Sequence, residues 1–310
     1  MDKSRSENTH EACRVDDALW LLQHGDLVGS IKLIEPQIAA HSADARAWAL
    51  WAELSRMRGR IEVAKQAANR ALELDPHSGW AFVERSRVLL AQGDVASALG
   101  SFEEAFVAGH EKGEWIQEWV ALLWKQGDYE RASEVALAYC ENRPKHARAW
   151  FILGYSLEQS AHLPSAVQAY QRCRKLDGQF PSINTSLARV FLEMGNFPRA
   201  SFHIDEAIVD EPECAIMWFT LAKIYQSRGH TGSAEIAIER SLALAPDCPE
   251  SLLLYAQILR AHSRWREAEE LIARSVVLLR RSGSSPETIS SAVGSIMTGA
   301  DMQQMSGLTK

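Results

Sequence analysis

Residues 147–180 read ARAWFILGYSLEQSAHLPSAVQAYQRCRKLDGQF, and this stretch decides the fold. In its first half, Trp150, Leu153 and Leu157 recur at i, i+3 and i+7, which places them on one face of a helix. Its second half opens with Pro164, a residue well suited to a first helical turn, and carries a second apolar face. The stretch therefore predicts two amphipathic helices joined by a tight turn.

The same 34-residue unit recurs along the chain. Glycine occupies six of eight positions spaced by 34 residues, and the two exceptions, Ala161 and Ser263, are small. The six are Gly25, Gly59, Gly93, Gly127, Gly195 and Gly229. Glycine at the end of a first helix permits a positive φ and therefore a tight turn. A fixed period of this length is typical of one supersecondary unit stacked on copies of itself.

A second ladder of small residues runs through the second helix of each unit. It consists of Ser30, Ala64, Ala98, Ala132, Ala166, Ala200, Ala234 and Ala268. A small side chain lets the first helix approach closely, and bulk at this point costs ~1–3 kcal/mol by overpacking. Proline ends the linkers at Pro76, Pro144, Pro212 and Pro246, where it stops the second helix.

These residues resemble the tetratricopeptide repeat, whose pattern is W-x2-L-G-x2-Y, then A-x3-F and a proline. One copy matches with Trp150, Leu153, Gly154, Leu157, Ala166 and Tyr170; another matches with Trp218, Leu221, Ala222, Tyr225, Ala234 and Pro246. The resemblance implies an all-α fold, a right-handed superhelical α-solenoid of about eight 34-residue helix-turn-helix repeats. They span residues 11–282, and the first and last copies are degenerate because end repeats have one solvated face.

The two ends of the chain have their own composition. Residues 1–10 are polar and are expected to form a disordered tail. Within residues 283–310, Ser285 and Pro286 resemble a helix start, and apolar residues follow at helical spacing: Ile289, Val293, Ile296 and Met297. We expect a C-terminal capping helix on the last repeat, followed by a flexible tail. A docking helix for a partner or for a second copy of the chain stays an alternative.

The composition limits the function classes. A net charge of −7 gives no support to nucleic-acid binding, which usually needs a basic face. The start of the chain lacks the apolar segment of a signal peptide, and no apolar run approaches the ~18 residues of a membrane span. Five cysteines without a CxxC motif suit a reducing compartment, so we expect a cytoplasmic protein without direct membrane insertion. Cys214 and Cys248 lie one repeat apart, which is too far for a disulfide, and are predicted to be free thiols.

Catalytic constellations are missing from the sequence. It contains no phosphate-binding loop, no nucleophile elbow and no H-E-x-x-H motif, and its histidines are strung along turns and linkers. The prediction is a chain that is not an enzyme and has no cofactor and no metal site. Acidic residues gather at Asp205, Glu206, Asp210, Glu211 and Glu213, which indicates a solvated outer face. Five tryptophans in first helices are predicted to be core: Trp48, Trp51, Trp119, Trp150 and Trp218.

The resemblance also implies a binding surface. In similar proteins the first helices line a concave groove that holds an extended peptide or a partner's helix. The groove-facing candidates are Arg56, Trp80, Glu84, Arg87, Glu118, Trp124, Phe151, Tyr155, Glu158, Arg189, Phe219 and Lys223. Aromatic residues rimmed by charge are typical of interface hot spots. Because the charges are of mixed sign, we expect an amphipathic protein or peptide partner.

The sequence therefore predicts a non-catalytic scaffold or adaptor that binds a partner polypeptide in the concave groove. Two alternatives stay open. The chain could be the recruiting arm of a glycosyltransferase or sulfotransferase system, or an assembly factor for a surface structure such as a pilus or exopolysaccharide machine. Self-association through the end repeats is a further open possibility.

Overall fold

The computed structural model describes residues 14–109, 114–294 and 296, and every regular element within them is a helix. The chain divides into two compact units, unit 1 over residues 1–144 and unit 2 over residues 145–310. The tail predicted at residues 1–10, Met297 and the predicted flexible end lie outside the described residues.

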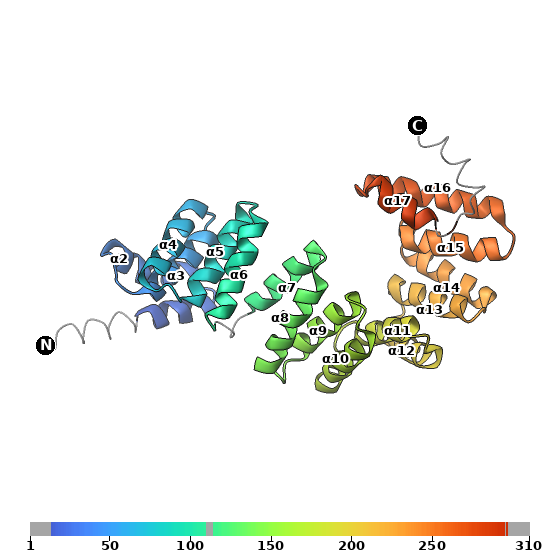
Figure 1. The fold of residues 1–310 in the computed structure, drawn as a ribbon, viewed down its shortest axis with the longest axis horizontal. Coiled ribbons are helices and arrows are strands. Elements are labelled where there is room, and N and C mark those ends of the chain that lie inside the picture. Colours follow the sequence, from blue (N-terminus) through green and yellow to red (C-terminus); the bar gives the residue numbers. More distant parts are fainter. Residues whose placement is uncertain (1–13, 110–113, 295, 297–310) are drawn as a thin grey trace. The chain divides into compact units, whose positions relative to one another are not determined.

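Unit 1 is a succession of helix pairs (Figure 1). Residues 14–23 form its first helix. The helices that follow are α2 (Leu27–Ala39), α3 (Ala45–Met57), α4 (Ile61–Leu74), α5 (Gly79–Ala91), α6 (Val95–Val107), α7 (Trp115–Gln126) and α8 (Tyr129–Asn142). The helix at residues 14–23 shares a buried cluster with α2 through Val15, Ala18 and Ile34. Helices α3 and α4, α5 and α6, and α7 and α8 form the next pairs.

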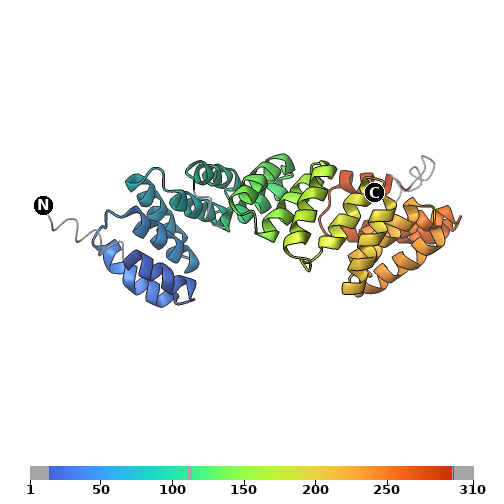
Figure 2. The ribbon, with the colours of Figure 1, turned by 90° about the horizontal axis from the view of Figure 1, so that it is seen from below.

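Unit 2 repeats the same arrangement (Figure 2). Its helices are α9 (Ala147–Gln159), α10 (Leu163–Leu176), α11 (Ile183–Glu193), α12 (Phe197–Asp210), α13 (Ala215–Ser227), α14 (Thr231–Leu244), α15 (Pro249–Ala261), α16 (Trp265–Arg281) and α17 (Pro286–Gly294). Each odd-numbered helix from α9 to α15 pairs with the helix that follows it. The predicted all-α array of consecutive helix pairs is confirmed.

The turn inside each pair explains the glycine ladder. All eight ladder positions have positive φ, from +71° to +82° at the six glycines and +61° at Ala161 and Ser263. The left-handed conformation costs an L-residue about 1–2 kcal/mol, a penalty that glycine does not have. The predicted left-handed turn is therefore confirmed, and it persists at the two positions that lack glycine.

Close approach within each pair explains the alanine ladder. Ser30 and all seven ladder alanines are at most 1% exposed. Gly154 of α9 shows such a close approach, because a Cβ at this position would lie 2.6 Å from Cδ1 of Tyr170 on the paired helix. Any larger residue at 154 would push α9 and α10 apart. Small residues at such points therefore set the distance between the two helices of a pair.

The tryptophans predicted to be core divide into two groups. Trp51 and Trp119 are buried, as predicted. Trp48, Trp150 and Trp218 are half-buried. The indole Nε1 of Trp48 donates to the carbonyl of Ser42, and that of Trp218 donates to the carbonyl of Pro212, both at 2.8 Å. These two rings therefore fasten the linker that precedes their helix.

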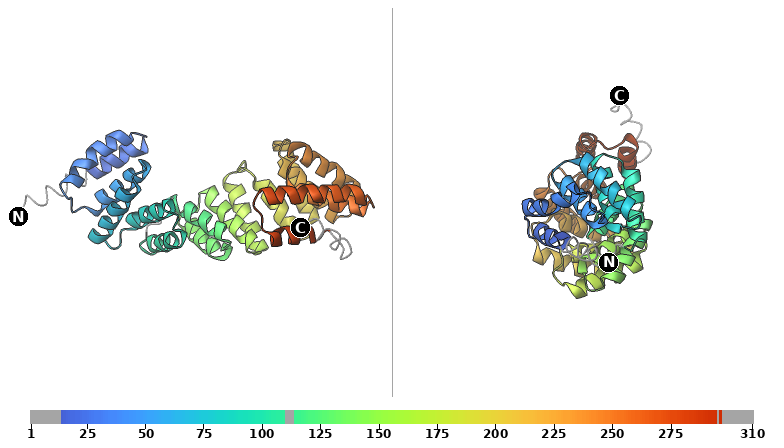
Figure 3. Two further views of the ribbon diagram at one scale, coloured as in Figure 1. Left: turned by 90° about the horizontal axis from the view of Figure 1, so that it is seen from above. Right: turned by 90° about the vertical axis from the view of Figure 1, so that its left-hand side faces the viewer.

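The last helix, α17, packs against α16 (Figure 3). Val293 and Ile296, which are 5% and 8% exposed, belong to a cluster with Ala256 of α15 and Ile272 of α16. Of the apolar residues that the sequence placed at helical spacing after Ser285, Ile289, Val293 and Ile296 thus pack on the last helix pair. This packing is what a capping helix requires.

Candidate protein-binding surfaces

In unit 1 the first helices of consecutive pairs are joined by a chain of ion pairs. Glu84 on α5 is 0% exposed and accepts hydrogen bonds from Arg56 of α3 at 2.9 Å and from Arg87 at 2.6 Å. Arg87 also donates two hydrogen bonds to Glu118 of α7, at 3.0 and 2.6 Å. We call the surface that the first helices form within one unit its first-helix face. In unit 1 this face is held together by alternating charges.

Burial and charge act against each other at Arg87. Burial by itself lowers the pKa of the guanidinium, but the hydrogen bonds that it donates to Glu118 and the charge of Glu84 outweigh this effect. The pKa of Arg87 therefore lies above its ordinary value, and the side chain stays charged at every pH at which the fold exists. The permanent charge of Arg87 therefore stands between the buried Glu84 and Glu118.

The first-helix face of unit 1 also contains a pocket of about 490 Å³. Its lining comes from the helix at residues 14–23, from α3 and from α5: Leu19, Leu22, Gln23, Glu53, Met57 and Trp80. Burial, and then the charge of Glu84, raise the pKa of the Glu53 carboxyl, while Arg87, Arg56 and a hydrogen bond with Trp80 oppose the shift. The pocket therefore combines apolar walls with one desolvated carboxyl group.

The first-helix face of unit 2 has a different centre. The Glu158 side chain of α9 is 1% exposed and forms a bidentate ion pair with Arg189 of α11, in which Nη2 lies 2.8 Å from Oε2. The hydroxyl of Tyr170 donates to the same Oε2 at 2.7 Å. Burial, and then the charge of Glu158, raise the pKa of the Tyr170 hydroxyl, so it remains a hydrogen-bond donor.

The aromatic candidates of unit 2 make ring contacts within the protein. The ring of Phe151 lies 5.6 Å from that of Tyr170 and 4.9 Å from that of Phe180. The ammonium of Lys223 lies 5.8 Å above the ring of Phe219, a cation–π distance. The candidates Phe151, Tyr155 and Phe219 are half-buried. Each ring thus has one face in the protein and retains exposed area.

The structure partly corrects the exposure predicted for the candidate residues. Nine of the twelve are half-buried and Glu118 is exposed: the nine are Arg56, Trp80, Arg87, Trp124, Phe151, Tyr155, Arg189, Phe219 and Lys223. Glu84 and Glu158 belong to the first-helix faces but are buried, so their side chains are not exposed there, and a role of either in binding stays a prediction. Each carboxylate is covered by an arginine from the first helix of a neighbouring repeat, Arg56 for Glu84 and Arg189 for Glu158. The helical periodicity of one repeat does not show which side chain of another repeat covers it.

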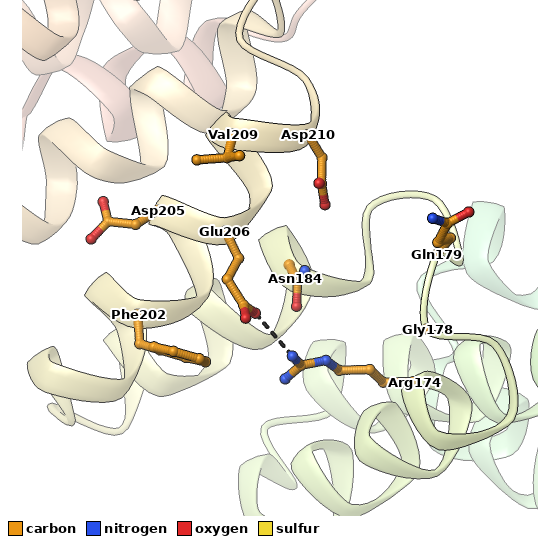
Figure 4. Close-up of a pocket in the computed structure, with 9 residues that line it drawn as sticks. All are labelled: Arg174, Gly178, Gln179, Asn184, Phe202, Asp205, Glu206, Val209 and Asp210. Atoms are coloured by element: carbon orange, nitrogen blue, oxygen red, sulfur yellow. Dashed lines mark hydrogen bonds and ion pairs between the residues drawn. The ribbon is translucent and has the colours of Figure 1, made fainter.

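A second depression lies in unit 2 beside the second helices α10 and α12 (Figure 4). It measures about 550 Å³ and has Phe202, Asp205, Val209 and Asp210 on the α12 side. Arg174 of α10 and Glu206 of α12 form an ion pair of 2.9 Å across it. The sequence identified the acidic residues but missed Phe202 and Val209, which are 55% and 81% exposed. Their i, i+7 spacing on one helix was the available signal.

The remaining chemistry of the described residues is sparse. Within residues 14–109, 114–294 and 296 there is no group of three or more His, Cys, Asp or Glu side chains that could hold a metal ion. Cys140, Cys173, Cys214 and Cys248 are free thiols, as predicted for the last two. Burial raises the pKa of Cys140 and of Cys173 to about 12, so neither is a reactive thiolate. Of the helices that the structure describes, none combines the length and the apolar run needed to cross a bilayer.

Comparison with known families identifies the class. The tetratricopeptide repeat profile matches residues 50–112, 119–179, 185–234 and 219–286, which is more than half of the chain. The chain therefore belongs to the tetratricopeptide repeat family, whose fold is typically a non-catalytic module for protein interaction. A search of curated proteins found no match.

Solved structures agree on the fold. YrrB, described as a TPR protein with an unusual peptide-binding site, shares 21% identity and has a TM-score of 0.53, covering 59% of this chain and 95% of its own. PilF of Pseudomonas aeruginosa shares 19% identity with a TM-score of 0.51, covering 70% and 97%. The Naa15/Naa10 complex bound to HypK-THB shares 14% identity with a TM-score of 0.53, covering 93% and 46%. At these identities the likeness shows the fold alone.

Proposed function

We propose that this chain is a non-catalytic scaffold that binds an extended peptide or a helix of a partner protein on its first-helix faces. The observation that carries the proposal is the pocket of about 490 Å³ in unit 1, because first helices of three consecutive pairs contribute to its lining. A polypeptide lying across the helices would meet this pocket and the charged residues beside it.

The half-buried aromatic residues support the same surface. Trp80, Trp124 and Phe219 belong to first helices and are neither fully buried nor fully exposed. A partly enclosed aromatic ring loses little entropy when a partner covers the rest of it, which is why such rings are common in interface hot spots. The free thiols support placing this scaffold in a reducing compartment such as the cytoplasm.

The test is a quantitative capture of partners from the native cell with three forms of the full chain. The first is wild type, the second carries Trp124→Ala, Phe151→Ala and Tyr155→Ala, and the third carries Phe202→Ala on the second helix α12. We expect one stoichiometric partner with wild type and with the Phe202 variant, and a loss of that partner with the triple variant. Thermal melting of each form shows whether the fold is retained.

Retention of the same partner at the same level by a folded triple variant would contradict the proposal. The two alternatives from the sequence, a recruiting arm of an enzyme system and an assembly factor for a surface structure, would use the same surface. The identity of the captured protein distinguishes them from a free-standing adaptor.

A further inference from the structure

The pocket in unit 1 has walls suited to an aliphatic chain. Leu19 and Leu22 contribute from the helix at residues 14–23, Met57 from α3 and Trp80 from α5. Met57 is 51% exposed, so part of its apolar surface is open to a ligand. Long side chains with a polar tip, such as Lys and Arg, cover apolar walls of this kind with their methylene groups.

The carboxyl group of Glu53 stands among these walls and forms no ion pair with any residue that the structure describes. The cations nearest to it, Arg56 and Arg87, donate their short hydrogen bonds to Glu84 and Glu118. Besides these two arginines, only Trp80 acts to lower the pKa of Glu53 among the described residues. A partly buried carboxylate is stabilised by an opposite charge, and none of the described residues supplies one in direct contact.

The charge balance of the network agrees with this. Two cations, Arg56 and Arg87, stand against three carboxylates, Glu53, Glu84 and Glu118. The cluster therefore carries one negative charge more than it neutralises. The surplus resides at Glu53, since Glu84 and Glu118 both accept hydrogen bonds from arginine. A monovalent cation inside the pocket would complete the network.

Trp80 adds a second attraction for a cation. Its indole and the Glu53 side chain both line the pocket, so a cation bound there would meet the ring and the carboxyl group together. Tryptophan is the best of the aromatic rings for a cation–π contact with Lys or Arg. An anionic or purely apolar side chain would leave the carboxyl group unsatisfied in a less polar environment.

We propose that the pocket lined by Leu19, Leu22, Met57 and Trp80 binds a Lys or Arg side chain of the partner polypeptide, whose cationic tip pairs with Glu53. This inference rests on the proposed function of the first-helix face. It gives the partner a defined chemistry at one point, a basic residue flanked by segments that cross α3 and α5. The raised pKa of Glu53 is consistent with a carboxyl group that lacks this counter-charge.

The experiment uses random 12-residue peptides displayed on phage and selected against the full chain. Selected peptides are then synthesised, and their affinities for wild type, Glu53→Gln, Trp80→Ala and Glu73→Gln are measured by fluorescence anisotropy. Glu53→Gln preserves size and the capacity to hydrogen bond but removes the charge. Glu73, on the exposed surface of the second helix α4, provides the matched control for loss of one carboxylate.

We expect the selected peptides to share one basic position. Glu53→Gln should lower affinity about tenfold, as is usual for loss of a charge-assisted hydrogen bond, and Glu73→Gln should leave it within twofold. Replacing the basic residue of the peptide by norleucine should also cost about tenfold in wild type, but no more than twofold in Glu53→Gln. This non-additivity would identify the two groups as direct partners.

Four results would overturn the inference. Peptides that bind without a shared basic residue, or whose affinity is unchanged in Trp80→Ala, would exclude this pocket while leaving the proposed function intact. Additive losses in the double-mutant cycle would show that the basic residue pairs with another group. Enrichment of no peptide at all would count against the proposed function as well as the inference. Circular dichroism of each variant shows whether the helices are retained.

Discussion

The first-helix faces of the two units use equivalent helices but balance their charges differently. In unit 1, Glu84 is shared between Arg56 and Arg87, and Glu53 forms no ion pair with a described residue. In unit 2, Glu158 receives both Arg189 and the hydroxyl of Tyr170. The charges of Arg189 and Lys223 both act on Glu193, so two cations stand beside the two carboxylates Glu158 and Glu193.

The two faces therefore differ in whether a partner would have to supply a counter-charge. In unit 2 the buried acid is satisfied by its own protein, and the exposed area that remains is aromatic, at Phe219 and Tyr155. In unit 1 the surplus negative charge is combined with an apolar pocket. We therefore expect charge recognition in unit 1 and mainly aromatic packing in unit 2.

The largest effect is expected from removing the buried carboxylates. Glu84→Ala and Glu158→Ala should each lower the free energy of unfolding by about 3 kcal/mol, because each leaves arginines without their buried partner. Glu158→Ala should cost more, since the fully buried Tyr170 also loses an acceptor. Urea unfolding followed by circular dichroism measures both.

The matched controls are Glu118→Ala and Glu158→Gln. Glu118 is 43% exposed, so its loss should cost less than about 1 kcal/mol. Glu158→Gln retains an acceptor for Tyr170 and should recover part of the loss in unit 2. Equal costs for Glu84→Ala and Glu118→Ala would contradict the central place of Glu84 in the network.

Substitution of a ladder alanine by leucine should lower the stability equally in both units. Ala98→Leu in unit 1 and Ala166→Leu in unit 2 should each cost about 2 kcal/mol, because both alanines are 0% exposed between paired helices. Hydrogen exchange should become faster in the neighbouring pairs as well, since repeat arrays are coupled to nearest neighbours. Gln168→Leu, at an exposed position of α10, is the control. Faster exchange confined to the substituted pair would show that the coupling is absent.

Lowering the pH should destabilise unit 2 through the buried His203. His203 of unit 2 is 7% exposed, and burial, with the charges of Arg174 and Arg199, lowers its pKa to about 4. Because the unfolded chain binds this proton near pH 6.5 and the folded chain does not, stability is complete above pH 6.5 and falls as the pH approaches 4. The loss between pH 7 and pH 5 should be about 2 kcal/mol.

His203→Gln should remove this part of the pH dependence, and His77→Gln in an exposed linker of unit 1 should not. Urea unfolding at the two pH values measures the difference, and hydrogen exchange at pH 5 should show earlier opening in unit 2. An identical pH dependence in wild type and His203→Gln would show that another group titrates.

The smallest effects are expected at the turns, with opposite signs in the two units. Gly127→Ala in unit 1 should cost about 1 kcal/mol, because alanine is strained at φ +76°. Ala161→Gly in unit 2 should stabilise by about 0.5 kcal/mol, since relief of the same strain exceeds the entropy that glycine adds to the unfolded chain. Thermal melting measures both. A loss of stability in Ala161→Gly would show that the entropy term is the larger one.

Much of the fold could be predicted because each repeat obeys local rules. The glycine ladder predicted the left-handed turns, and the alanine ladder predicted the close helix pairs, from spacing alone. The surface was harder to predict. From the sequence, Glu84 and Glu158 were grouped with their exposed neighbours on the first helices, although both are buried. The acidic residues Asp205 and Asp210 were recognised, but the exposed Phe202 on the same helix was not. Helical period shows which face a residue belongs to, but not which side chain of the next repeat covers it.

The sequence by itself determined the repeat length, the helix pairs and the family, because these depend on spacing within 34 residues. Only the tertiary structure decided which charges are neutralised and which are left over. The arginine partners of Glu84 lie 28 residues before it and three residues after it, and the arginine partner of Glu158 lies 31 residues after it. The physical reason is that the free energy of a buried charge depends on the groups in contact with it, and those contacts form only when repeats stack.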